Sequence, residues 1–217
     1  MSQFREPAYG RRSLCDVLPA ALNALGATDV PAPTELQLRP AEHYVVLLVD
    51  GLGYHLIAQH PRQAPYLHSL LGSQPAGTCG VPSTTATSLT GLGTGAATGQ
   101  HGMVGFTQRV PETGALLNSL FWDQPVDPLH WQSLPTMFDR AAGQGISATV
   151  VSKSEFAGSG LTRSALRGAE FVGTGGVEER ISAAVSASRT SPSLTFVYDG
   201  DLDGVGHRSG VDSDLWR

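Results

Sequence analysis

Apolar residues in this chain form short continuous runs, separated by segments in which apolar residues recur at helical spacing. The clearest run, residues 43–49 (HYVVLLV), is rich in β-branched residues and is followed by Asp50 and Gly51. Such a run, bounded by turn residues, predicts a fully buried strand. Residues 146–151 and 194–198 are of the same kind and predict two further strands.

Helical patterns lie between these strands. They predict helices over residues 54–59, 64–71, 83–92 and 178–187, and one or two short helices over residues 13–25, where Pro19 is expected to be a break. Another helix is expected after Ser133, its candidate N-cap, with Pro135 in the first turn and Gly143 and Gly145 at its end. Strands that alternate with helices indicate an α/β fold, with a largely parallel sheet and helices on both faces.

The chain is expected to divide into an N-terminal arm with short helices, residues 1–42, and a catalytic domain, residues 43–217. Within the domain, residues 103–132 carry four large aromatic side chains and three prolines: Phe106, Phe121, Trp122, Trp131, Pro111, Pro125 and Pro128. This composition indicates an irregular excursion, which we expect to cover a pocket.

Composition narrows the functional classes. The chain is 41% hydrophobic and 15% charged, as in ordinary soluble globular proteins. Its net charge is −5 and no segment is basic, which argues against a nucleic-acid-binding surface. No run approaches the ~18–20 apolar residues that span a bilayer, and the N-terminus lacks the apolar core of a signal peptide, so a cytoplasmic location is expected. The cysteines, Cys15 and Cys79, make neither a disulfide framework nor a cysteine metal site.

Candidate chemistry follows the predicted strands. Asp50 comes directly after the first strand, and residues 199–207 (DGDLDGVGH) follow the last. Ligands of parallel α/β sheets bind beyond the carboxyl ends of the strands, so these groups are expected at one edge. Asp203 and His207 are four residues apart, which places them on one face of a helical turn, although Gly204 and Gly206 are equally compatible with a tight loop. A carboxylate and an imidazole together suit zinc and similar divalent ions.

Hydroxyl residues open the segment at 83–92. Ser83, Thr84 and Thr85 are compatible either with a simple helix N-cap or with a nucleophile at a helix start. Asp50 is likewise compatible with an ordinary turn residue, and His101 with a histidine packed among loop glycines.

Taken together, these pieces resemble the alkaline phosphatase superfamily, and most closely its type I phosphodiesterase/nucleotide pyrophosphatase branch. The resemblance covers roughly residues 43–210. It rests on the order of four motifs, namely Asp50-Gly51, then Thr85 with Thr94-Gly95, then His101-Gly102, and finally the run from Asp203 to His207.

The resemblance implies roles for individual residues. Asp50 matches a metal ligand, and Asp203 and His207 match the pair that holds the other metal. Thr85 matches the nucleophile, which is also a metal ligand, with Thr84 as the alternative register. His101-Gly102 matches a common loop without a settled role, and Asp199 and Asp201 lie nearby without being assigned as ligands. Two divalent ions are implied; zinc is favoured, with manganese, cobalt or magnesium as alternatives.

The function implied is metal-dependent hydrolysis of a small phosphate ester or nucleotide, at a phosphodiester or nucleotide pyrophosphate bond, through a phospho-threonine intermediate. No Arg or Lys lies between residues 64 and 107, which favours a less charged diester. A phosphomonoesterase or phosphomutase of the same superfamily, a non-catalytic nucleotide-binding domain and a degenerate relative remain alternatives. The Cys/Ser-x-Pro-x-Arg setting of a sulfatase is absent.

One departure from the family pattern concerns the remaining metal ligands. The resemblance implies a later Asp-His pair and a final His, and neither follows His207 in this sequence. We therefore expect the sequence to be an N-terminal portion of the catalytic domain, which by itself binds metal weakly and has little or no activity.

Overall fold

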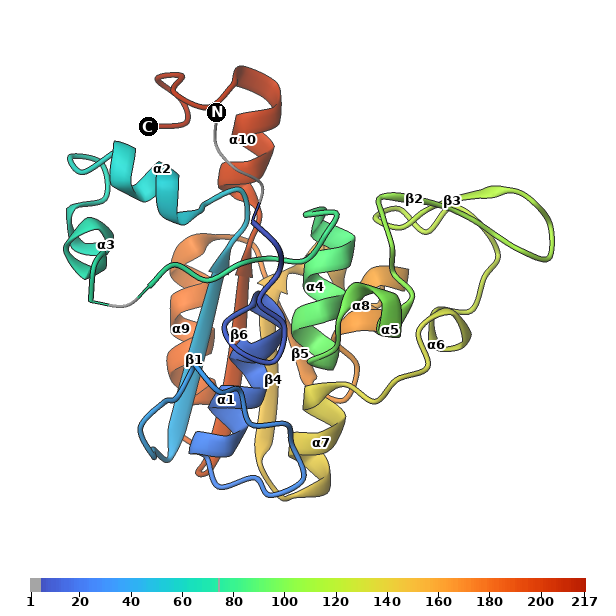
Figure 1. The fold of residues 1–217 in the computed structure, drawn as a ribbon, viewed down its shortest axis with the longest axis horizontal. Coiled ribbons are helices and arrows are strands. Elements are labelled where there is room, and N and C mark those ends of the chain that lie inside the picture. Colours follow the sequence, from blue (N-terminus) through green and yellow to red (C-terminus); the bar gives the residue numbers. More distant parts are fainter. Residues whose placement is uncertain (1–4, 74) are drawn as a thin grey trace. The chain divides into compact units, whose positions relative to one another are not determined.

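A computed structural model describes residues 5–73 and 75–217 (Figure 1). The chain forms two compact units. The first unit comprises residues 1–46 and 78–197, and the second unit comprises residues 47–77 and 198–217. The expected boundary between an arm and a catalytic domain at residue 43 stays a prediction.

A four-stranded sheet in the order β1-β6-β4-β5 is the centre of the fold. Its strands are β1 (His43–Val49), β4 (Ser147–Lys153), β5 (Glu170–Thr174) and β6 (Ser193–Asp199). Strand β4 is parallel to both β5 and β6. Strand β1 runs in the same direction as β6, because Glu42 O accepts from Ser193 N at one end and Asp199 O accepts from Asp50 N at the other. The predicted largely parallel sheet is confirmed, whereas β5 had not been predicted.

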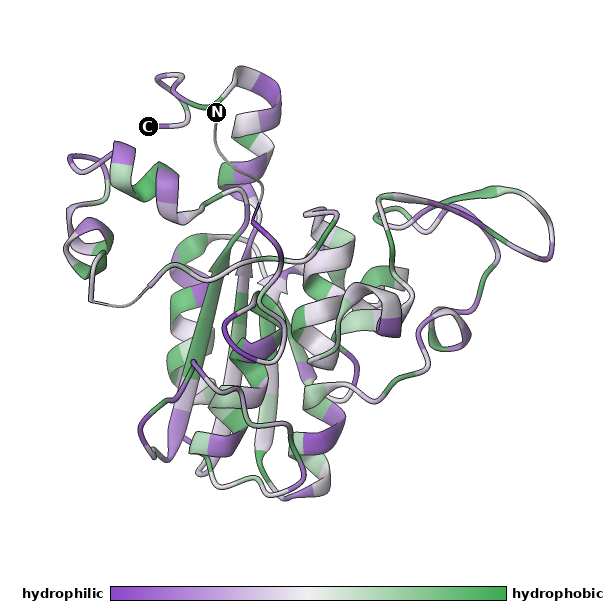
Figure 2. Ribbon diagram, in the orientation of Figure 1, coloured by the Kyte–Doolittle hydropathy of each residue, from purple (hydrophilic) through white to green (hydrophobic). Residues whose placement is uncertain are grey.

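Helices cover both faces of this sheet. Successive side chains of β4 and β6 point to opposite faces, and the buried side chains on each face need a packing partner. Val151 and Val197, which are register partners, pack with Ala184 of α9 (Val177–Ala187). On the opposite face, the ring of Phe196 lies 6.3 Å from the ring of Phe138 in α7 (Met137–Gly143). Helices α1 (Val17–Ala24) and α4 (Thr85–Thr94) pack with α7. Figure 2 shows hydrophobic residues along β1, whereas hydrophilic residues are frequent in α10.

The prediction that residues 43–49 form a fully buried strand is wrong in its burial. Strand β1 is present with the predicted bounds, but the side chains of Val45 and Leu47 are 49% and 62% exposed. The reason is its position at the edge of the four-stranded sheet, where β6 is its neighbour. In contrast, the first five residues of β6 are buried, as predicted.

Two predictions about helix starts are corrected. Pro19 does not break the helix over residues 13–25, because it is the third residue of α1, where its missing N–H has no intrahelical partner to lose. Ser133 does not cap α7. Thr136 does, since its hydroxyl accepts from Asp139 N at 3.0 Å and Asp139 accepts from Thr136 N at 2.9 Å. This reciprocal capping box satisfies two amide groups at once.

The predicted helices over residues 54–59 and 64–71 are confirmed as α2 (Tyr54–Gln59) and α3 (Pro65–Leu70) of the second unit. Residues 103–132 include an antiparallel hairpin and a short helix, and their predicted role as a pocket cover stays a prediction. No helix in the described part of the chain is both long and apolar enough to cross a membrane. The remaining elements are η1 (Leu14–Asp16), α5 (Thr98–His101), β2 (Thr107–Arg109), β3 (Leu116–Asn118), α6 (Pro128–Trp131), η2 (Ser154–Phe156), α8 (Gly160–Ala165) and α10 (Asp201–Ser209).

Candidate active site

The carboxyl ends of β1 and β6 meet at Asp50 in the second unit. Asp50 N donates to the carbonyl of Asp199 at 2.8 Å, which ties the two strand ends together. The Asp50 carboxylate accepts from the hydroxyl of Tyr198 at 2.7 Å and from Gly51 N at 2.9 Å. These two hydrogen bonds orient the carboxylate at the sheet edge where ligands of parallel α/β proteins bind. Tyr198 is a site residue that the sequence analysis did not single out.

Gly51 brings Asp203 close to Asp50. Its backbone has φ of 74°, which favours glycine, and a Cβ at this position would lie 2.9 Å from the Cα of Asp203. The turn after β1 therefore contacts the first turn of α10 with no space for a side chain. The missing side chain at Gly51 thus allows the carboxylates of Asp50 and Asp203 to approach each other.

The segment after β6 forms a helix, α10, despite Gly204 and Gly206. Asp199 Oδ1 accepts from the N–H of Asp201 at 2.9 Å and so satisfies an amide at the helix start. The helix places Asp203 Oδ1 3.5 Å from His207 Nε2, which confirms that this pair shares one helix face. Side chains of Asp203 and His207 are 34% and 81% exposed.

Negative charge is concentrated at this edge of the sheet, where β1 and β6 end. The pKa of Asp203 is raised, first by burial and then by the charge of Asp50. The nearby His207 lowers it, but by less. The pKa of Tyr198 is raised by burial and by the neighbouring Asp50 carboxylate, so its hydroxyl keeps its proton and donates it in the hydrogen bond. The edge thus presents carboxylate charge that a cation would neutralise.

The donor set of Asp50, Asp203 and His207 fits a divalent metal in its chemistry. Two carboxylates and an imidazole are ligands that zinc takes, and the mutual repulsion of the carboxylates is relieved by a cation. In residues 5–73 and 75–217, no group of three or more His, Cys, Asp or Glu side chains has the arrangement to hold a metal ion. The structure places these three candidates in the second unit and the fourth, Thr85, in the first unit.

In the first unit, the predicted helix over residues 83–92 is α4, which begins two residues later at Thr85. Thr84 is its N-cap. The Thr84 hydroxyl accepts from Thr87 N at 3.4 Å and donates to Thr87 Oγ1 at 3.1 Å. Thr85 is therefore the first helical residue, and the helix ends at Thr94, with Gly95 at a φ of 65° as its C-cap. The two threonines differ in role although they are neighbours in sequence.

His101, the last residue of α5, is almost fully buried, with 2% of its surface exposed. Its Nδ1 accepts from Met103 N at 3.1 Å. Burial lowers the pKa of His101 to about 4, so the ring is neutral at physiological pH. The interpretation of His101 as a packed histidine agrees with this burial, although the residue ends a short helix and does not lie in a loop.

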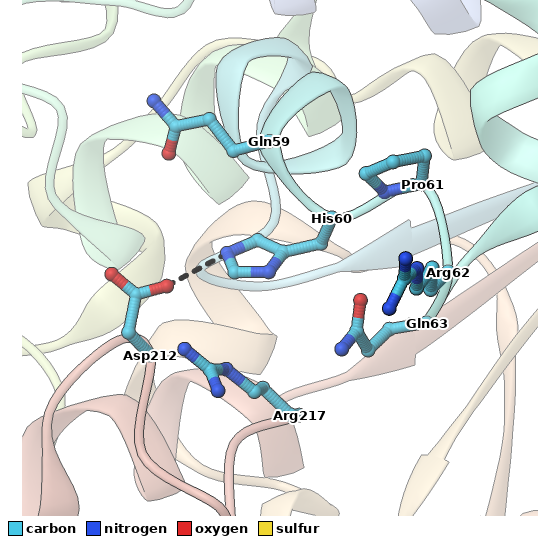
Figure 3. A pocket seen from close by; sticks show the side chains of 7 residues that line it. All are labelled: Gln59, His60, Pro61, Arg62, Gln63, Asp212 and Arg217. Carbon is cyan, nitrogen blue, oxygen red and sulfur yellow. Dashed lines mark ion pairs between the residues drawn. The ribbon is translucent and has the colours of Figure 1, made fainter.

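A separate surface pocket in the second unit contains none of the candidate residues (Figure 3). His60 Nε2 lies 2.9 Å from Asp212 Oδ1, and the His60 ring lies 5.0 Å from that of Trp216. This pair joins the end of α2 to the segment after α10. The pocket is lined by Gln59, His60, Pro61, Arg62, Gln63, Asp212 and Arg217.

The fold and the strand-end residues define the class of protein: a parallel α/β protein with carboxylate and imidazole side chains at the carboxyl edge of its sheet. The particular family follows from comparison. The family model of type I phosphodiesterase / nucleotide pyrophosphatase matches residues 44–217, and the chain belongs to this family. No curated protein matches the chain.

Solved structures show the same fold. Murine ectonucleotide pyrophosphatase/phosphodiesterase 5 has 16% sequence identity and a TM-score of 0.62, with 81% of this chain and 48% of that chain covered. An inactive threonine-to-alanine variant of the same murine protein, in complex with AMP, has 17% identity and a TM-score of 0.60 over the same shares. The chain thus spans about half the length of these solved relatives.

Proposed function

We propose that this chain carries the nucleophile and part of the metal site of a hydrolase that cleaves phosphodiester or nucleotide pyrophosphate bonds in small molecules. One observation carries the proposal: the ends of β1 and β6 are joined by a hydrogen bond, and the turn at Gly51 contacts α10. This contact brings Asp50 close to Asp203. Family membership supports phosphate-ester hydrolysis as the reaction.

Thr85 is the proposed nucleophile. Both hydrogen-bonding functions of the neighbouring Thr84 hydroxyl are engaged in capping α4, which makes Thr84 the weaker candidate. Thr85 stands at the start of a helix whose backbone N–H groups favour bound anions. The murine relative supports a threonine in this role, since its threonine-to-alanine variant is described as inactive and in complex with AMP.

Asp50, Asp203, His207 and Thr85 are the residues proposed to hold two divalent ions, with zinc favoured. When bound, such ions lower the pKa of a coordinated hydroxyl and neutralise phosphate charge. Other protein groups position these ligands. Tyr198 orients the Asp50 carboxylate, and the residues after Asp199 form the helix that aligns Asp203 with His207.

The reaction proceeds in two displacements at phosphorus. Thr85 Oγ bonds to phosphorus as the ester oxygen leaves with its electron pair; the hydroxyl proton passes to solvent and the leaving group takes up a proton. Water then cleaves the phospho-threonine bond and restores the hydroxyl. Absence of Arg and Lys from residues 64–107 favours a diester over a more charged monoester.

The test compares Thr85→Ala with Thr84→Ala, in this chain and in the longest polypeptide that its reading frame encodes. Aryl phosphodiester and aryl phosphomonoester hydrolysis is measured with added Zn²⁺, Mn²⁺ or Mg²⁺. We expect Thr85→Ala to lower diester turnover by at least about 10³-fold, as loss of a covalent nucleophile does, while zinc affinity is largely retained through Asp50, Asp203 and His207. Thr84→Ala should cost about 1 kcal/mol of stability through loss of the cap, and it should lower turnover far less than Thr85→Ala does.

Three results would overturn parts of the proposal. Activity retained in Thr85→Ala and lost in Thr84→Ala would move the nucleophile by one residue. A strong preference for the monoester would favour a phosphomonoesterase or phosphomutase. Tight AMP binding without hydrolysis by any of these polypeptides would favour a non-catalytic nucleotide-binding protein. The cytoplasmic location stays a proposal.

A further inference from the structure

A buried chain of hydrogen bonds links His101 to the start of α4 in the first unit. His101 Nδ1 accepts from Met103 N at 3.1 Å, and Met103 O accepts from Thr87 Oγ1 at 3.0 Å. Thr87 Oγ1 in turn accepts from the Thr84 hydroxyl at 3.1 Å. The exposed fractions of His101, Met103 and Thr87 are 2%, 0% and 1%, so the bonds among these three residues are shielded from water, whereas the bond from Thr84 to Thr87 is partly buried.

The number of protons on each hydroxyl determines which group donates in each of these hydrogen bonds. A threonine hydroxyl has one proton, and Thr87 gives its proton to the carbonyl of Met103. Thr87 Oγ1 can therefore only accept from Thr84, which commits the Thr84 proton as well. The lone pairs of Thr84 remain for the N–H of Thr87. One carbonyl, placed by His101, thus orients both hydroxyls of the cap.

We propose that His101 is a positioning residue for the nucleophile: its Nδ1 anchors the Met103 segment, which through Thr87 and Thr84 holds the first turn of α4 and hence Thr85. This inference rests on the proposed function, because it takes Thr85 as the reacting residue. In this inference, His101 of the His101-Gly102 motif acts as a hydrogen-bond acceptor.

The other ring nitrogen of His101 explains why the residue is not an acid or a base. Since Nδ1 accepts, Nε2 carries the proton, and it is buried without a hydrogen-bond partner among the described residues. It lies beside Gly91, where an added Cβ would meet Nε2 at 3.6 Å and the sulfur of Cys15 at 2.8 Å. Burial raises the pKa of Cys15 to about 11, so the neighbouring thiol is neutral too. A proton enclosed in this way is not exchanged with a substrate.

Asparagine is the matched substitution, because its Oδ1 can occupy the place of Nδ1 and accept from Met103 N, while it has no counterpart of Nε2. His101→Leu removes the acceptor with similar volume. We expect His101→Asn to keep kcat within about threefold and His101→Leu to lower it about 10- to 100-fold at nearly unchanged KM, as small misplacements of a reacting group do. Thr87→Ser should behave like His101→Asn, and Thr87→Val like His101→Leu.

A second measurement is independent of catalysis. Nitrogen-15 NMR of the histidine-labelled protein should show His101 as the Nε2-protonated tautomer, with no titration between pH 5 and 8, and the Met103 amide should exchange slowly with solvent. The Asn variant should preserve that protection and the Leu variant should lose it. Melting curves of the folded variants separate loss of positioning from loss of the fold.

The outcomes are distinct. Equal loss of kcat in His101→Asn and His101→Leu would overturn the inference and point to chemistry at the ring. A titration of His101 near its ordinary pKa, or an Nδ1-protonated tautomer, would overturn it as well. If the wild-type polypeptides hydrolyse no phosphate ester, the proposed function fails and the nucleophile-positioning role fails with it. In that case the NMR measurement shows only whether His101 holds the start of α4 in place.

Discussion

The two halves of the proposed chemistry lie in contrasting surroundings. In the first unit, Thr87 and His101 are buried, Thr84 is half-buried, and directional hydrogen bonds between uncharged groups link the three residues through Met103. Around Asp50 and Asp203, the second unit is partly exposed and concentrates negative charge. A hydroxyl nucleophile has to be held in place by directional hydrogen bonds, whereas the ligands of a cation have to present negative charge to it.

The difference also concerns what holds each region together. The first unit relies on close backbone approach and buried bonds, which tolerate few changes. The second unit relies on the Gly51 contact and on the bonds that orient Asp50 and start α10. Four substitutions with graded effects, added to the Thr85 comparison above, test this contrast.

The largest effect is expected from Gly93→Ala in the first unit. An added Cβ would lie 1.8 Å from the carbonyl oxygen of Ala165, so α4 and α8 would have to separate. We expect a loss of roughly 3 kcal/mol or more in the free energy of unfolding, measured by urea denaturation. Gly99→Ala is the control, since nothing lies within 4 Å of its added Cβ. Equal stability of the two variants would contradict the close approach of the helices.

The next effect is a pH dependence that arises from His101. Its pKa is about 4 in the folded protein, below the ordinary value of 6.5, because of burial. The unfolded chain therefore binds the proton more tightly, and stability falls as pH decreases from about 6.5 to about 4. The loss reaches at most about 3 kcal/mol at the acid end. His101→Asn should flatten this part of the stability profile relative to wild type, and an unchanged slope would rule out His101 as its source.

A smaller effect is expected from Gly51→Ala in the second unit. The substitution puts a Cβ 2.9 Å from Asp203 Cα and strains a backbone with φ of 74°. We expect about 1–3 kcal/mol of destabilisation together with weaker zinc binding, measured by denaturation and calorimetry. Gly53→Ala should change neither quantity appreciably, because nothing lies within 4 Å of its added Cβ. Unchanged zinc affinity in Gly51→Ala would separate this turn from the metal site.

The smallest effect is expected from Tyr198→Phe, which removes the hydroxyl that donates to Asp50. Loss of one such hydrogen bond to a charged group costs about 1–2 kcal/mol. Zinc affinity should fall modestly as the Asp50 carboxylate loses its orientation. Tyr66→Phe, at a side chain that is 74% exposed, is the control for both measurements. A Tyr198→Phe variant with wild-type stability and affinity would show that the bond does not organise the edge.

The sequence by itself determined the features that depend on near neighbours. Runs of β-branched residues predicted β1, β4 and β6, and the spacing of Asp203 and His207 predicted their approach, because residues four apart share a helix face. Ordered motifs predicted the family, which the family model confirms over residues 44–217. Where several hydroxyls compete locally, as between Ser133 and Thr136, the pattern chose the wrong cap.

Only the tertiary structure decided which distant groups meet. The hydrogen bond between Tyr198 and Asp50 joins residues 148 apart in sequence, and the contact of Gly51 with Asp203 depends on the turn after β1 and on α10 together. The exposure of β1 likewise follows from its place at the sheet edge, and the short strand β5 is recognised by its pairing with β4. The physical reason is common to all of these cases: local propensity and periodicity act over a few residues, whereas close packing and hydrogen-bond partners are set by chain segments that only folding brings together.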